Sequence, residues 1–400
     1  MNKFSRWPFY TSGAVAEVVR RITTSADTIS AIHPDPAVTA LEQAFADRIV
    51  PGARVLYCNS GTSALHAAYL ALGLDAGAEI IVPTMTFRAT VTPLLLANLC
   101  PVLVDCDAYG QLDPGAVNAA ITTRTQAVVV THLWGHPAQL DALRNIVDQH
   151  SLAFVEDCSH AHGTVHASAG PVGAHSDVAV WSLGGYKPVT GGLGGMLATR
   201  DSTLYQRALL IGQPKYRMLA EITIPSLRPI ASTGLGAHHR GAPLHAVLAA
   251  DTLSRLDEGI IHRRRHHDAL EGLLAQCLPD LTPLPPHAMW AAGAWYRRPY
   301  QWIHPNINCN DIVSALNAEG LPVTTMMKPL HFESLFTSPQ AEFGLRVQPV
   351  LTDCPTADRF FRFGVEWDSR AFYALNKGLH GDIRRRVHGL GLEKGGSGQR

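Results

Sequence analysis

Residues 181–197 read WSLGGYKPVTGGLGGML and place one lysine, Lys187, among six glycines in an apolar run. The chain has only six lysines, and none lies between Lys3 and Lys187. An amine held in an apolar pocket has a lowered pKa, so part of it is neutral near pH 7 and can attack an aldehyde to form a Schiff base. In isolation, the same motif is also typical of a surface lysine in a flexible glycine loop.

Strand-like and helix-like segments alternate before and up to this motif. Short apolar, mostly β-branched runs predict strands at 54–57, 79–83, 102–105, 127–131, 153–156 and 177–181, and helices at 62–72, 91–99 and 139–150. This alternation predicts an α/β fold with a mostly parallel central sheet and flanking helices. Ligands of such sheets bind beyond the C-terminal ends of the strands. The candidate residues follow those ends: Gly61, Thr62, Phe87, Asp157 and Lys187.

The second half of the sequence has a different pattern. It predicts one long helix from 244 to about 274, a proline-rich break at 279–286, a strand at about 295–303 and a helix at 310–319. We therefore expect a large domain at 1–259 and a smaller C-terminal α+β domain at 260–390. The tail 391–400 has the composition of a linker and is expected to be disordered.

The segment NSGTS at 59–63 joins a predicted strand to a predicted helix. Gly61 allows close backbone approach, and the helix N-terminus offers free N–H groups and a positive dipole end, which suit a phosphate. Thr62 adds a hydroxyl group. The alternative is a purely structural N-cap, because serine and threonine commonly precede helices.

The segment FVEDCSHAHG at 154–163 ends an apolar strand in two acids. Asp157 at the tip of that strand can hold a protonated ring nitrogen; the alternative is that Glu156 and Asp157 cap the next element. A zinc site built from acid and histidine side chains fits no common zinc spacing, so we expect no metal. The residues of that alternative site are Asp157, His160, His162 and His166.

Taken together, these segments describe a site for pyridoxal 5′-phosphate (PLP). The phosphate is assigned to Gly61, Thr62 and Ser182, which lies five residues before the lysine. The pyridine nitrogen is assigned to Asp157 and the aldehyde carbon to Lys187.

The chain resembles the DegT family of PLP-dependent sugar aminotransferases, of fold type I. The resemblance runs from about residue 7 to about residue 367. The motifs that carry it are NSGTSALHAAYLALGL (59–74), EIIVPTMTFRAT (79–90), THLWGHPAQLDAL (131–143), VEDCSHAHGT (155–164), WSLGGYKPVTGGLGGMLAT (181–199) and HHRGAPLHAVLAADTLSRLDE (238–258).

The resemblance implies a role for each matching residue. Lys187 matches the lysine that links to the cofactor and moves the proton, and Asp157 matches the acid on the ring nitrogen. Phe87 matches the aromatic residue that stacks on the cofactor ring, although without the family, core packing is the simpler reading. His160 stands near the position of the phenolic oxygen. His238 and Arg240 lie in the segment that crosses from the partner subunit, so a homodimer with its active site at the interface is implied.

The resemblance also implies the reaction. We expect an aminotransferase that moves an amino group from glutamate or glutamine to a keto-sugar, cyclitol or related ketone in sugar or antibiotic biosynthesis. Two departures from the family pattern keep another PLP-dependent reaction open, such as a lyase, a dehydratase or carbon–carbon bond formation. Leu193 replaces an acid in the usual Gly-Glu-Gly-Gly, and 238–240 reads HHR instead of Asn-Tyr-Arg or Lys-Tyr-Arg. A regulator without catalytic activity is the other alternative.

Composition limits the remaining classes of function. The formal net charge is zero, and charged residues make up 16%, which gives no basic surface for nucleic acid or for an anionic membrane. No apolar run reaches the roughly 18 residues needed to span a bilayer. The seven cysteines are scattered without a CxxC pair, and the N-terminus has no apolar core of signal-peptide length. We therefore expect a cytoplasmic protein.

The sequence does not fix the substrate. Specificity is expected to come from the loops 215–228 and 326–336 and from the segment of the partner subunit. Lys328 and His331 can face the substrate or lie on the surface. The weaker candidates are aromatic or histidine residues: Trp7, Tyr10, His33 and Trp134.

Overall fold

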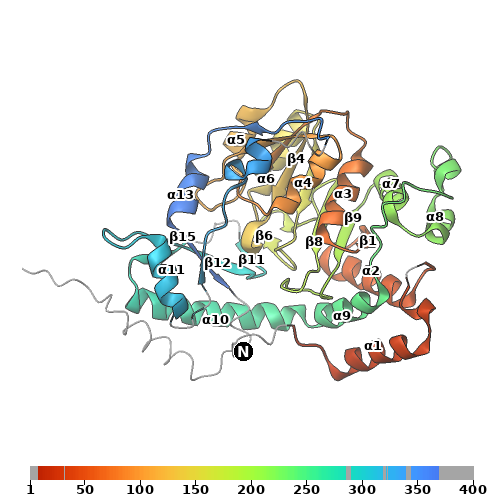
Figure 1. Cartoon of the computed structure of the whole chain (residues 1–400), viewed down its shortest axis with the longest axis horizontal. Helices are drawn as coiled ribbons and strands as arrows, with labels where there is room; N and C mark the ends of the chain where they lie inside the picture. The colour runs from red at the N-terminus through yellow and green to blue at the C-terminus, as the bar shows by residue number, and fades with distance from the viewer. Residues whose placement is uncertain are drawn as a thin grey trace, which may run out of the picture.

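The computed structural model describes residues 8–30, 32–284, 290–318, 321, 323–338 and 344–368. An eight-stranded sheet lies at the centre of the molecule, with helices on both faces (Figure 1). Its strand order is β1-β9-β8-β5-β4-β2-β3-β14. The bounds are β1 (Arg54–Cys58), β2 (Glu79–Pro83), β3 (Cys100–Val104), β4 (Thr125–Thr131), β5 (Ala153–Asp157), β8 (Val178–Ser182), β9 (Gly195–Thr199) and β14 (Val350–Leu351).

The sheet is parallel except for β9, which pairs antiparallel with both β1 and β8. The other strands therefore end at the same edge, as the βα alternation predicts. The strand β9 follows the glycine-rich loop directly and was not predicted, because its first residue belongs to the glycine run. The mostly parallel α/β sheet is confirmed.

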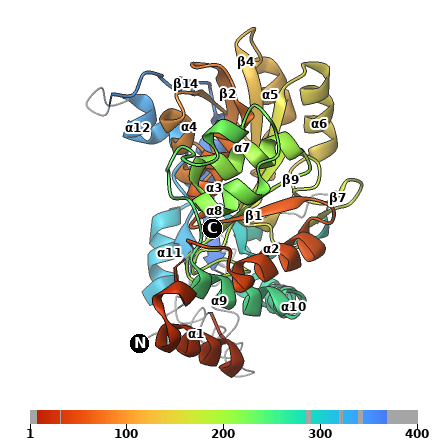
Figure 2. The ribbon, with the colours of Figure 1, turned by 90° about the vertical axis from the view of Figure 1, so that its right-hand side faces the viewer.

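Alternating strand residues face two hydrophobic layers. Val55, Val128 and Phe154 point to one face, whereas Leu56, Val129 and Val155 point to the other. The first face is covered by α2 (Pro36–Ile49), α5 (Pro114–Ala120), α6 (Leu140–Gln149) and α9 (Pro243–Ser254). The second face is covered by α3 (Gly61–Leu72), α4 (Thr92–Leu96), α7 (Ser202–Gly212) and α8 (Lys215–Glu221). Helix α1 (Ser12–Thr24) packs outside α9 (Figure 2).

A smaller four-stranded antiparallel sheet follows in the sequence, in the order β10-β12-β15-β13. Its own core contains Tyr300, Trp302 and Trp367. The bounds are β10 (Leu281–Pro283), β12 (Arg297–Trp302), β13 (Val323–Thr325) and β15 (Gly364–Asp368), with helices α10 (Leu256–Cys277), α11 (Cys309–Ala318) and α13 (Pro355–Phe363). Helix α12 (Ser334–Thr337) instead packs on the second face of the central sheet through Phe336. A third, three-stranded sheet consists of β6 (Val165–His166), β7 (Gly170–Pro171) and β11 (Trp290–Ala292).

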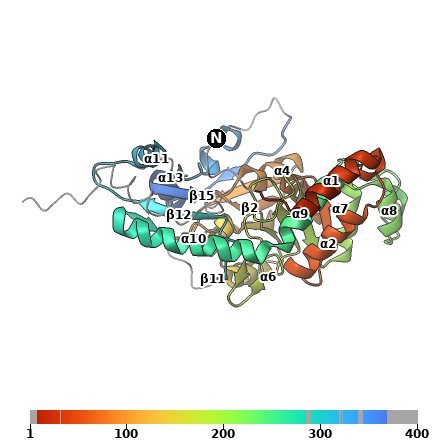
Figure 3. The same cartoon turned by 90° about the horizontal axis from the view of Figure 1, so that it is seen from below.

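Two predicted helices differ from the observed ones. The expected long helix at 244–274 is two helices, α9 and α10, which meet at Arg255 (Figure 3). Thr252, one turn before the break, bonds to the backbone of Thr190 with its side chain, so the end of α9 is fixed to the lysine loop. The expected helix at 91–99 ends at Leu96, because Asn98 adopts a left-handed φ of 59°.

The expected boundary between residues 259 and 260 falls inside α10 and stays a prediction. The expected tail at 391–400 lies outside the described residues. Among the described residues, none of the helices has the length and apolar character that crossing a bilayer requires.

Candidate functional site

The lysine loop connects β8 to β9 and is closed by its own backbone. Leu183 N–H donates to the carbonyl of Gly194 at 2.8 Å, and Gly191 N–H donates to the carbonyl of Leu183 at 3.1 Å. Gly192 and Gly194 have φ of 84° and 139°, which glycine adopts without strain. The loop that carries Lys187 is therefore a fixed turn rather than a flexible surface loop.

The N-terminus of α3 lies directly against the end of β8. Ser60 caps the helix and accepts a hydrogen bond from Ser63 N–H at 3.0 Å. A Cβ on Gly61 would lie 2.8 Å from Ser182 Cβ, so only glycine allows this approach. The structure thus brings together Gly61 and Ser182, and exposed Thr62 follows at the open end of the helix. The first N–H groups of a helix have no intrahelical partner, and an anion can accept from them.

Asp157 is buried at the C-terminal end of β5, and both of its carboxylate oxygens are held. Thr90 donates its hydroxyl to Asp157 Oδ2 at 2.8 Å, and Ser159 N–H donates to Oδ1 at 3.0 Å. Tyr69 fixes Thr90 in turn by donating its hydroxyl to the Thr90 carbonyl at 2.6 Å. The carboxylate is therefore oriented by three elements at the centre of the sheet edge.

The amine of Lys187 is held in a poorly solvated position. Burial lowers its pKa from 10.5 to about 7; the Asp157 carboxylate opposes this change, and the Arg297 guanidinium adds to it. A substantial fraction of the amine is therefore neutral at pH 7, which is the form that acts as a nucleophile or base. This agrees with the sequence argument for an apolar pocket.

His160 lies next to the lysine and is neutral. Its pKa is well below its usual range, because burial disfavours the charged ring and the Lys187 ammonium repels it. Its Nδ1 accepts a hydrogen bond from Trp134 N–H at 3.3 Å, so the ring proton lies on Nε2. His160 can therefore donate a hydrogen bond to an oxygen atom.

Phe87 follows β2 and is half-exposed, so core packing does not explain it. Its ring lies under the guanidinium of Arg88, 4.7 Å from the ring centroid. It lines a cavity of about 330 Å³ together with Lys328 and Glu333, whose charged atoms are 3.6 Å apart. The Phe87 side chain is therefore accessible to a ligand from this cavity, apart from the face that Arg88 covers.

The segment that contains His238 and Arg240 lies beside the end of β1. Its middle residue, His239, accepts from Asn59 N–H at 2.7 Å, and the Arg240 side chain bonds to His238 Nδ1 at 2.5 Å. The segment therefore contacts Asn59, which lies two residues before Gly61 at the start of α3. Its expected role in a partner subunit stays a prediction.

The remaining candidate residues from the sequence lie in different surroundings. His331 bonds to Thr84 through Nδ1 at 2.7 Å and to Asp358 through Nε2 at 2.8 Å, so both of its nitrogens are engaged. Trp134 is fully buried, and His33 stacks on the exposed ring of Tyr216. Tyr10 lies 3.5 Å from the carbonyl of Thr190 in the lysine loop. Trp7 lies outside the described residues.

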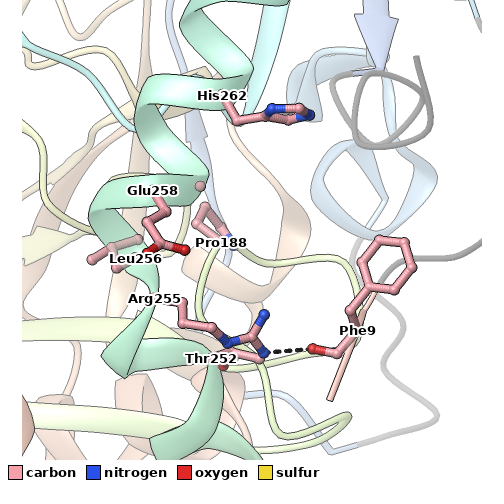
Figure 4. Close-up of a pocket in the computed structure, with 8 residues that line it drawn as sticks. Phe9, Pro188, Thr252, Arg255, Leu256, Glu258 and His262 are labelled. Atoms are coloured by element: carbon pink, nitrogen blue, oxygen red, sulfur yellow. Dashed lines mark hydrogen bonds between the residues drawn. The ribbon is translucent and has the colours of Figure 1, made fainter. Parts of the chain in front are cut away.

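A pocket adjoins the lysine loop on the side of α9 and α10 (Figure 4). Its volume is about 220 Å³, and Pro188, the residue after the lysine, forms part of its wall. Arg255 spans it and donates to the carbonyl of Phe9 at 2.6 Å. This hydrogen bond holds the N-terminal segment in the same pocket as Pro188 of the lysine loop.

Among the described residues, possible metal ligands come together in a cluster that differs from the zinc alternative considered above: His132, Glu156 and Cys158. Glu156 Oε2 lies 2.9 Å from His132 Nε2 and also accepts from Gly173 N–H at 2.8 Å. Burial raises the pKa of the Cys158 thiol well above its usual range. His132 and Glu156 are therefore engaged in a hydrogen bond that joins the residue after β4 to β5.

A model of the DegT/DnrJ/EryC1/StrS aminotransferase family matches residues 14–350. The chain belongs to this family. It is an aminotransferase, and the expected fold type I architecture is confirmed. The resemblance drawn from the sequence motifs is confirmed as well.

Two curated members of the DegT family are similar over most of their length. An L-glutamine:2-deoxy-scyllo-inosose aminotransferase of Streptoalloteichus tenebrarius is 30% identical over 94% of this chain and 91% of the relative. An L-glutamine:scyllo-inosose aminotransferase of Streptomyces griseus is 32% identical over 90% of this chain and 87% of the relative.

Among solved structures, 3-amino-5-hydroxybenzoic acid synthase superimposes with a TM-score of 0.81 at 25% identity, over 98% of this chain and 99% of the other. DesI, solved in the presence of its TDP-sugar product, superimposes with a TM-score of 0.76 at 27% identity, over 94% and 89%.

The sequence did not indicate some residues that build this DegT-family site. Thr90, which orients Asp157, stands in the motif TMTFRAT, and its position after a strand end was the available signal. Tyr296 and Arg297 reach the site from the small sheet, and no local pattern marks them. Contacts between elements far apart in the sequence decide their positions.

Proposed function

We propose that this DegT-family aminotransferase transfers an amino group from L-glutamine to a keto-cyclitol of the scyllo-inosose type, with PLP as its cofactor. The supporting observation is that the two curated relatives named above carry out reactions of this class and match at least 90% of the chain. Glutamate as donor and a keto-sugar as acceptor are the variants that the experiments below separate.

The residues at the strand ends fit PLP. The close approach of Gly61 to Ser182 leaves a helix N-terminus and a hydroxyl group beside each other, which suits the phosphate. The buried carboxylate of Asp157 suits a protonated ring nitrogen, and the partly neutral amine of Lys187 suits the aldehyde. When bound, the cofactor supplies an aldehyde carbon and a ring that accepts electrons.

Each side chain of the site has its own role in the proposed reaction. Lys187 would be the base that removes the proton from the donor carbon in the first half-reaction, and the acid that delivers a proton to the acceptor carbon in the second. Asp157 would accept a hydrogen bond from the protonated ring nitrogen, and the hydrogen bonds from Thr90 and Ser159 hold its carboxylate in place for that contact. His160 would donate its Nε2–H to the phenolic oxygen of the bound cofactor, and Phe87 would pack on its ring.

The cavity beside Phe87 suits a polyhydroxylated acceptor. Its wall combines apolar side chains with two cations, Arg88 and Lys328, and one acid, Glu333. Charged groups of this kind exchange hydrogen bonds with the hydroxyl groups of such an acceptor. Lys328, rather than His331, is therefore the substrate-facing candidate of this loop.

We include a homodimer and a cytoplasmic location in the proposal. Val15, Val19 and Ile22 form an exposed apolar stripe on α1, which a second subunit would cover. Free thiols are found at Cys58, Cys100, Cys106, Cys158, Cys309 and Cys354. This is typical of a reducing compartment.

Separate half-reactions test the proposed function. The purified protein, loaded with PLP, is mixed with L-glutamine or L-glutamate, and the loss of visible absorbance reports the donor half-reaction. The aminated enzyme is then mixed with scyllo-inosose, 2-deoxy-scyllo-inosose or a nucleotide-linked keto-sugar, and the return of absorbance reports the acceptor. Recovery with the sugar alone would overturn the cyclitol assignment, and no loss with either donor would overturn the aminotransfer proposal.

A second experiment tests the covalent assignment. Borohydride reduction followed by peptide mass spectrometry is expected to place the cofactor on Lys187 in the wild type and nowhere in Lys187→Ala. Cofactor attached to Lys215 or to another lysine would contradict the assignment.

A different PLP-dependent reaction remains the second candidate. One similar structure is a synthase by name, and Leu193 replaces an acid beside the lysine loop. Product analysis of the second half-reaction distinguishes the two cases. An amine with the carbon skeleton and hydroxyl groups of the ketone supports aminotransfer, and loss of water or a new carbon–carbon bond supports the alternative.

A further inference from the structure

Tyr296 connects the small sheet to the lysine loop. It directly precedes β12, and its ring stacks on the imidazole of His160, with centroids 4.2 Å apart and planes inclined by 24°. The amine of Lys187 lies over the same ring, 4.6 Å from the centroid. One aromatic side chain therefore contacts the two groups that follow β5 and β8.

The backbone beside this ring is fixed by an ion pair with a buried acid. Arg297, the first residue of β12, pairs with Glu366 of β15, which is 1% exposed. The other oxygen of Glu366 accepts from Trp134 Nε1 at 3.0 Å. Tyr296 is thus fixed from the side of the small sheet.

Trp134 contacts both Glu366 and His160, so the contacts around Tyr296 form a ring of interacting residues. Trp134 has a left-handed φ of 60°, and its N–H donates to His160 Nδ1. Tyr296 contacts Lys187 and His160. His160 bonds to Trp134, and Trp134 bonds to Glu366. Glu366 pairs with Arg297, which directly follows Tyr296 in the chain. Left-handed backbone at a residue other than glycine persists where the surroundings enforce it.

Tyr296 and Arg297 act on the lysine in opposite directions. The face of an aromatic ring attracts a cation and favours the ammonium form. The Arg297 guanidinium lies 5.8 Å from the same ring and disfavours a second cation. The other groups that face the amine are the Asp157 carboxylate, which favours the ammonium, and the neutral rings of His160 and His162.

We propose that Tyr296 is a positioning residue for amino transfer: its ring holds the Lys187 amine and the His160 imidazole, and the Arg297–Glu366 pair holds the ring. The small sheet then sets the geometry and the charge of the reacting amine. This inference rests on the proposed role of Lys187, which the mass-spectrometric test examines separately.

Titration of the cofactor-free protein tests this inference without any substrate. Lysine amines are labelled by reductive methylation with ¹³C-formaldehyde, and the Lys187 signal is assigned by its absence in Lys187→Arg. Two matched pairs of variants are compared with the wild type. The pair Tyr296→Phe and Tyr296→Leu keeps or removes the aromatic face, and the pair Arg297→Lys and Arg297→Gln keeps or removes the cation.

The expected shifts have opposite signs. Tyr296→Leu lowers the pKa of Lys187 by roughly 0.5–1 pH unit, because a cation–π contact is lost, and Tyr296→Phe leaves it near the wild-type value. Arg297→Gln raises the pKa, and Arg297→Lys leaves it near the wild type. A Tyr296→Leu protein that titrates like the wild type, or a Tyr296→Phe protein that shifts equally, overturns the proposal.

A folding control and a separate readout keep the test decisive. If near-ultraviolet circular dichroism shows that Tyr296→Leu is misfolded, the Arg297 pair decides, and equal titration of its two members overturns the proposal. Failure of the proposed function has a different signature, since a protein that aminates no cyclitol can still show the opposite pKa shifts.

Discussion

Replacing Lys187 with methionine is expected to stabilise the cofactor-free protein, and the gain is expected to depend on pH. The amine has a pKa of about 7 in the folded protein, against 10.5 without its surroundings. The folded protein therefore binds fewer protons than the unfolded chain between these two values, and its stability rises with pH across that range. Burial of the amine lowers the free energy of unfolding by its full amount below about pH 7, and this loss disappears as the pH approaches 10.5.

The size of the effect follows from this difference. One pH unit corresponds to about 1.4 kcal/mol, so the full penalty is on the order of 5 kcal/mol. At pH 7 the folded amine is already half neutral, which leaves about 4 kcal/mol. At pH 9.5 about 1.5 kcal/mol remains. Methionine is apolar and similar in length, so it fills the space of the lysine without a charge.

Urea unfolding at pH 7 and pH 9.5, followed by tryptophan fluorescence at equal protein concentration, measures this difference. The control is Lys215→Met, because Lys215 is exposed at the start of α8 and is expected to show no gain that depends on pH. A gain for Lys187→Met that is equal at both pH values, or a loss of stability at pH 7, would refute the buried-amine argument.

Two further predictions concern a close backbone approach in the site and a buried ion pair. Gly61→Ala is expected to weaken PLP binding at least tenfold and to cost about 1–3 kcal/mol of stability, because the new methyl group would press against Ser182; cofactor titration and urea unfolding measure both effects. Gly272→Ala, which meets no neighbouring atom in α10, is the control, and equal behaviour of the two variants would contradict the close approach. Arg217→Met is expected to destabilise the protein by about 3–5 kcal/mol, because it leaves the buried Glu42 carboxylate without its cation. The melting temperature measures this loss, and an unchanged value would show that Glu42 does not depend on Arg217.

The sequence predicted the central sheet because its strands are short, apolar and separated by helices, a pattern set by local physics. It also predicted that Gly61 and Ser182 would meet, and the structure brings them together. The lowered pKa of Lys187 agrees with the apolar pocket inferred from its neighbours in the sequence. These features could be predicted because parallel strands end at a common edge.

Features that depend on distant partners were not predicted. The reversed strand β9 is hidden in the glycine run, since Gly195 is there to let Ser60 approach closely. The break at Arg255 follows one turn after the bond between Thr252 and the lysine loop, a distant contact that helix propensity does not reveal. Tyr296 contacts Lys187 from more than 100 positions away in the sequence, so its role appears only in three dimensions.

Helix α10 has a practical consequence for dissecting this molecule. It begins at Leu256 and continues to Cys277 beside the small sheet. A gene cut after residue 259 would split this helix within its first turn and would leave Leu270 and Leu274 on a fragment whose helix has lost its beginning. Fragment complementation, tag insertion or domain exchange with related enzymes is therefore better attempted in the segment around Arg255, where the helical hydrogen bonding is already interrupted.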